Sequence, residues 1–88
     1  MTTTEILAAA APHAPSARGI IAAIANGTNT SFSGAERKAL RRVGEIERSD
    51  EHRVELYATR AIINVAQAER GAPAALDCAR NCIEMMAR

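Results

Sequence analysis

Residues 51–70 read EHRVELYATRAIINVAQAER, a stretch that neither proline nor glycine interrupts. Most of its apolar side chains recur at intervals of three or four residues, the spacing of a helix that buries one broad face. The members of this face are Val54, Ala58, Ala61, Ile62, Val65 and Ala68, with Tyr57 at its edge. Ser49-Asp50 before the stretch is typical of a helix N-cap, and Gly71 is typical of the residue that follows a helix. We therefore predict that the longest helix of the chain runs from about residue 51 to residue 70.

Leu56 and Ile63 form a second apolar stripe on this helix, because residues seven positions apart share a face and this pair lies roughly opposite the first face. Two explanations are open. The helix can be packed on both sides by other parts of its own domain, or Leu56 and Ile63 can contact a partner or a second copy. Burial distinguishes the two, since a contact surface is exposed in the free monomer.

Two short apolar segments precede this helix. Thr4 is suited to cap a first helix, which Pro12 ends. A second helix is predicted from about residue 15 to Asn26, and Gly27 suits the left-handed conformation that commonly follows a helix. Together they indicate an apolar helical hairpin over residues 4–26.

Two further helices are indicated by their starting residues. Ser33 followed by Glu36 matches a capping box and predicts a helix over about 34–48. Pro73 suits the first turn of a helix and predicts one over about 73–87. No segment alternates apolar and polar residues as a strand would. We therefore expect an all-α fold, a compact bundle of four or five short antiparallel helices in a single domain, 1–88.

The composition limits the core and the class of protein. Tyr57 and Phe32 are the only aromatic residues among 88, so burial must come from aliphatic side chains and alanine, and a homo-oligomer would add to it. A net charge of +1 argues against coating nucleic acid or an acidic membrane by bulk electrostatics. The apolar runs 6–11 and 20–25 are far shorter than the roughly 20 residues of a membrane span, and no secretory signal pattern is present. We expect a cytoplasmic protein.

The predicted helix over 34–48 has a basic face. Its members are Arg37, Lys38, Arg41, Arg42 and Arg48. Guanidinium groups four residues apart can bind neighbouring carboxylates or phosphates through paired hydrogen bonds. The alternative is a solvated face with pairs such as Arg41 with Glu45, because alternating charge is the common use of such a surface.

Cys78, Cys82 and Met85 share one side of the predicted C-terminal helix. Two cysteines four residues apart could bind a soft metal if further ligands came from elsewhere. Neither His13 nor His52 has a suitable spacing to supply them. We therefore expect both cysteines to be small buried apolar residues, and we predict no metal and no cofactor.

No nucleophile, base or phosphate-binding motif is present, so we do not expect an enzyme. We predict instead a small interaction module: an adaptor, a regulator or a compact inhibitor of the kind that phage and mobile elements use. Its expected partner is a protein with an acidic surface. The alternative is a nucleic-acid-binding regulator that uses the same basic helix as a dimer. The predicted contact residues are Arg37, Lys38, Arg41, Arg42, Arg48, Asn29, Phe32, Leu56 and Ile63.

Overall fold

The computed structural model describes residues 1–88 and contains five α-helices, three short 3-10 turns and no β-strand. The α-helices are α1 (Thr3–Ala10), α2 (Arg18–Asn26), α3 (Gly34–Ile46), α4 (Arg53–Glu69) and α5 (Ala75–Ala87). The 3-10 turns are η1 (Ala11–His13) and η2 (Pro15–Ala17) between α1 and α2, and η3 (Asp50–His52) before α4. The predicted all-α bundle is therefore confirmed, and its dimensions are 33 × 27 × 20 Å.

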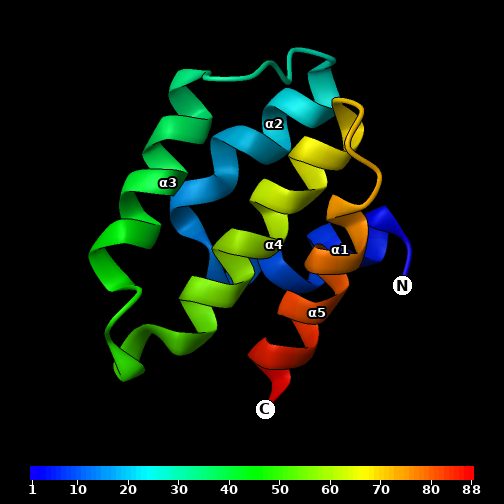
Figure 1. Cartoon of the computed structure of the whole chain (residues 1–88). Coiled ribbons are helices and arrows are strands. Elements are labelled where there is room, and N and C mark those ends of the chain that lie inside the picture. The colour runs from blue at the N-terminus through cyan, green and yellow to red at the C-terminus, as the bar shows by residue number, and fades with distance from the viewer.

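Helix α4 lies in the middle of the bundle and contacts all four other helices (Figure 1). Both of its apolar stripes are therefore covered. Ile62 and Val65 on the first stripe are fully buried, and Leu56 and Ile63 on the second are only 6% exposed. The prediction that Leu56 and Ile63 form a contact surface is wrong, because the chain's own helices already bury both side chains.

The core is built largely from small residues, which let the helices approach closely. Gly19 in α2 shows how close: a Cβ at this position would lie 3.0 Å from the Cβ of Ala35 in α3. The solvent-accessible surface area of 5128 Å² is near the roughly 5,000 Å² expected of a compact monomer of this mass. One chain therefore closes its core without the additional burial that an oligomer would supply.

The N-terminal helix begins earlier than its sequence predicts. Thr2, and not Thr4, is the cap: its hydroxyl accepts from the backbone N–H of Glu5 at 3.2 Å. The carboxylate of Glu5 in turn accepts from the N–H of Thr2 at 2.9 Å, which completes a capping box. At the other end of the hairpin, Gly27 has φ 71° after α2, as predicted.

Three other boundaries and exposures differ from the predictions. Helix α3 ends at Ile46, and Pro73 lies in a turn before α5 starts at Ala75. The predicted core residue Val54, in the first turn of α4, is 39% exposed. None of the helices combines the length and the apolar character that crossing a lipid bilayer requires.

Candidate interaction surface

The turn before α3 presents Phe32 to solvent. Its side chain is 81% exposed, and its backbone has φ 59°, in the left-handed region that a bulky residue rarely adopts. Two charged side chains from the first turn of α3 hold it there. The N–H of Phe32 donates to Glu36 Oε2 at 3.0 Å, and its carbonyl accepts from Arg37 Nε and Nη2 at 2.9 and 2.7 Å. The backbone is thus fixed in a conformation that costs about 1 kcal/mol or more, while the ring remains free.

A buried polar network lies beneath this turn and ties it to the end of α4. Arg70 donates from Nη2 to Glu36 Oε1 at 2.7 Å and from Nη1 to Asn29 Oδ1 at 3.0 Å. Asn29 Nδ2 donates to the carbonyl of Ala66 at 3.0 Å. The side chain of Glu36 is 7% exposed and that of Arg70 is 19% exposed, so this ion pair is largely shielded from water.

The network bears on two residues named from the sequence, Asn29 and Glu36. Asn29 donates one N–H to Ala66 and accepts from Arg70, so it holds the loop in place, and its role as a contact residue stays a prediction. Ser33 caps α3 as predicted, since its hydroxyl accepts from the N–H of Glu36 at 3.2 Å. The Glu36 carboxylate, however, does not return to Ser33 as in a capping box but binds Phe32 and Arg70.

The predicted basic residues fall into two groups. Lys38, Arg41 and Arg48 are exposed and form no salt bridge, although Arg48 lies beyond the end of α3. Arg37 is also exposed, and its charge is not neutralised because its partner is the Phe32 carbonyl. These four side chains remain candidates for binding an anionic surface.

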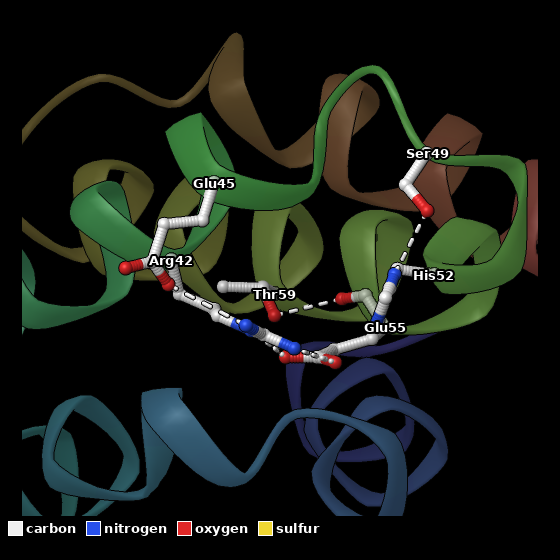
Figure 2. Close-up of polar contacts among 6 residues, drawn as sticks. All are labelled: Arg42, Glu45, Ser49, His52, Glu55 and Thr59. Atoms are coloured by element: carbon white, nitrogen blue, oxygen red, sulfur yellow. Dashed lines mark hydrogen bonds and ion pairs between the residues drawn. The ribbon is translucent and has the colours of Figure 1, made fainter.

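Arg42 belongs to the second group, because its guanidinium pairs with carboxylates of its own chain (Figure 2). Its Nε and Nη2 donate to the two carboxylate oxygens of Glu55 on α4, at 2.6 and 3.0 Å, and Nη1 lies 3.4 Å from Glu45. The hydrogen bond with Arg42 lowers the pKa of Glu55 and raises that of Arg42. Arg42 therefore links α3 to α4 and is not a free contact residue. The expected pair of Arg41 with Glu45 is not formed.

Ser49 and His52 form a further polar contact in the same region, with 2.9 Å between Oγ and Nδ1. A nucleophile and base of this kind need a third group that orients the base. The nearby carboxylate of Glu55 is bound by Arg42 through both oxygens, and its backbone carbonyl accepts from Thr59 Oγ1 at 2.7 Å. We interpret the Ser49–His52 contact as one that closes the turn between α3 and α4.

The two cysteines differ in exposure. Cys82 is 8% exposed, and burial raises the pKa of its thiol. Cys78 is exposed, so the prediction that both are buried is wrong for this residue. Cys78 lies one turn nearer the N-terminus of α5, whereas Cys82 lies against α4, where Asn64 Nδ2 donates to its Sγ at 3.8 Å. No three His, Cys, Asp or Glu side chains come together in a way that could hold a metal ion.

The middle of α3 carries a glycine that sequence reasoning missed. Gly44 is exposed, and a Cβ there would meet nothing within 4 Å. A glycine in the interior of a helix costs about 0.5–1 kcal/mol relative to alanine. Nothing in the chain itself accounts for this cost.

Comparison with known protein families, with functionally characterised proteins and with solved structures finds no match to this chain.

Proposed function

We propose that the chain is a small, non-catalytic interaction module that binds an acidic surface of a protein partner. Phe32 is the apolar anchor in this proposal, and Arg37 and Lys38 on the first turns of α3 form its basic rim. Such a module acts as an adaptor, a regulator or an inhibitor by occupying a surface of its partner. The observation that supports the proposal best is the exposed ring of Phe32 on a strained and firmly held backbone.

The strained backbone of Phe32 points to an interaction because it gives the exposed ring no packing within its own chain. Unusual backbone conformations persist where the surroundings enforce them, and they cluster at binding and catalytic sites. A pocket on a partner would bury the Phe32 ring, and aromatic residues are enriched among the residues that dominate binding energy. Because Glu36 and Arg37 already fix the turn, little conformational entropy is lost on binding.

Affinity capture from the native cell with matched variants tests this proposal. F32A removes the anchor. Its control is V54A, which shortens an exposed apolar side chain on a different helix, α4. K38E reverses a charge on the rim, and R18E reverses an exposed charge on α2. We expect F32A and K38E to lose a partner that wild type, V54A and R18E retain. Equal recovery by all five proteins would contradict the proposal.

A nucleic-acid-binding regulator is the alternative. An exposed aromatic ring beside basic side chains is the arrangement on which unpaired bases stack, and this observation favours single-stranded nucleic acid. Contacts from Arg37, Lys38 and Arg41 to three phosphates predict a slope of about −2 for the logarithm of affinity against the logarithm of salt. Absence of binding at low salt would exclude this alternative.

A further inference from the structure

One face of α4 holds two arginines against a single tyrosine ring. The guanidinium carbon of Arg53 lies 5.6 Å from the centre of the Tyr57 ring, and that of Arg60 lies 6.0 Å from it. Arg60 approaches Glu47, which follows α3, and Arg53 donates to the carbonyl of Arg88, which follows α5. The face is therefore bordered by the C-terminal ends of α3 and α5, which lie on either side of α4 in Figure 1.

The two guanidinium groups on this face are poorly neutralised. Arg53 forms no salt bridge, and its one acceptor is a backbone carbonyl at 3.0 Å. Arg60 has one carboxylate nearby, that of Glu47 at 3.8 Å, which is beyond hydrogen-bond distance and largely exposed to water. Arg42 shows the contrast, since it binds a carboxylate through two hydrogen bonds at 2.6 and 3.0 Å. Arg53 and Arg60 thus keep donors that the chain itself does not use.

The hydroxyl of Tyr57 adds a third unused group to this face. It has no hydrogen-bond partner within the chain, and the hydroxyl of Ser16 is the only side-chain polar atom that is buried without one. The Tyr57 hydroxyl therefore reaches solvent and is free to donate to a ligand. Two guanidinium groups and one phenol are available on the same side of α4.

These groups favour a tetrahedral anion. A guanidinium group has five N–H donors and no acceptor, so a ligand must bring negative charge and several acceptor oxygens. The two oxygens of a carboxylate lie in one plane and match the fork of a single arginine. A phosphate monoester presents three free oxygens in three directions and about two negative charges, which suits two arginines and a hydroxyl.

We propose that Arg53, Tyr57 and Arg60 bind a phosphate monoester group. Both guanidinium groups donate to its oxygens at the hydroxyl edge of the ring, and the Tyr57 hydroxyl donates to the same group. Stacking on the ring already holds both arginines close to this edge, so little side-chain freedom is lost on binding. The site goes beyond the proposed function, because it shares no residue with the surface around Phe32.

Titration with inorganic phosphate, followed by NMR of the arginine side-chain N–H groups, tests the site. Acetate at the same pH and ionic strength is the matched control anion. We expect the signals of Arg53 and Arg60 to shift and saturate with a Kd of about 1 mM for phosphate, and at least about tenfold weaker binding of acetate. Shifts that never saturate, or equal affinity for the two anions, would overturn the proposal.

Five variants test which side chains hold the anion. R53Q and R60Q should each weaken phosphate binding about tenfold, and Y57F about threefold, whereas R18Q on α2 should bind as wild type does. E47Q removes the competing carboxylate beside Arg60 and should tighten binding about threefold. Circular dichroism checks that each variant keeps the wild-type helix content. Equal losses in R18Q and R53Q, or no gain in E47Q, would overturn the assignment.

Two ligands distinguish the sources of the phosphate group. Glycerol phosphate represents a small metabolite, and a phosphoserine hexapeptide represents a phosphorylated protein. Tighter binding of one than of inorganic phosphate, lost in R53Q, would support the site and identify its source. If neither ligand bound, the proposal of a phosphate monoester site would be overturned.

Discussion

Replacing Arg70 with methionine should destabilise the whole domain, because it leaves the carboxylate of Glu36 buried without a cation. The Glu36 side chain is 7% exposed and lies 2.7 Å from Arg70. Removing one partner of a fully buried ion pair costs about 3–5 kcal/mol. Here Arg70 is 19% exposed, and Glu36 keeps its bond to the Phe32 N–H, so we expect R70M to cost about 2 kcal/mol and about 10 °C in Tm.

Urea unfolding followed by circular dichroism measures this loss. The control is R60M on the same helix, since Arg60 and Glu47 are 39% and 45% exposed and 3.8 Å apart. Removing such an exposed pair should cost less than about 1 kcal/mol. Adding E36Q to R70M should recover part of the loss, because the unpaired charge is then absent. If R70M cost no more than R60M, or if E36Q brought no recovery, the reasoning about the buried pair would be refuted.

Three further predictions concern the remaining polar groups, the thiols and Gly44. Arg42 holds the pKa of Glu55 below its ordinary value of 4.5, so the stability from this ion pair is complete above that pH and is lost as the pH falls through the folded-state pKa. Urea unfolding should therefore show E55Q less stable than wild type at about pH 7, with a smaller difference at about pH 3. With a maleimide under native conditions, Cys78 should react rapidly and Cys82 slowly, because Cys82 is buried with a raised pKa; equal rates would contradict this difference. G44A should raise the free energy of unfolding by about 0.5–1 kcal/mol, because a Cβ at this exposed helical position meets nothing within 4 Å, and a loss of stability would contradict this expectation.

The helices could be predicted from the sequence because their determinants are local. Apolar spacing, Ser33 as a cap and Gly27 as a terminator each act within one helical turn. The errors at helix ends have a local cause too. Thr2 and Thr4 are both suitable caps, and only Thr2 has Glu5 at the position that completes a capping box.

The candidate site was only partly predictable, since its geometry depends on contacts between distant residues. Arg37 and Lys38 could be found from their charge, but no local pattern indicates that Arg70 binds Glu36 and Asn29 across more than thirty positions. The same applies to Arg42. It is adjacent to Arg41 in the sequence and carries the same charge, and only its ion pair with Glu55 on α4 distinguishes it from the unpaired Arg41. The sequence also gives no indication that Phe32 has a positive φ, because bulky residues are rare in that conformation.

The free energy of unfolding of F32G, measured together with capture of the partner, tests most directly whether Phe32 is held exposed for binding. Glycine adopts φ 59° freely, and the ring is 81% exposed, so relief of strain should offset the greater entropy of the unfolded chain. We predict stability equal to wild type or up to about 1 kcal/mol higher, with partner affinity reduced about thirtyfold. A loss of more than about 1 kcal/mol in stability with the partner still captured would show that Phe32 serves the fold and not an interaction.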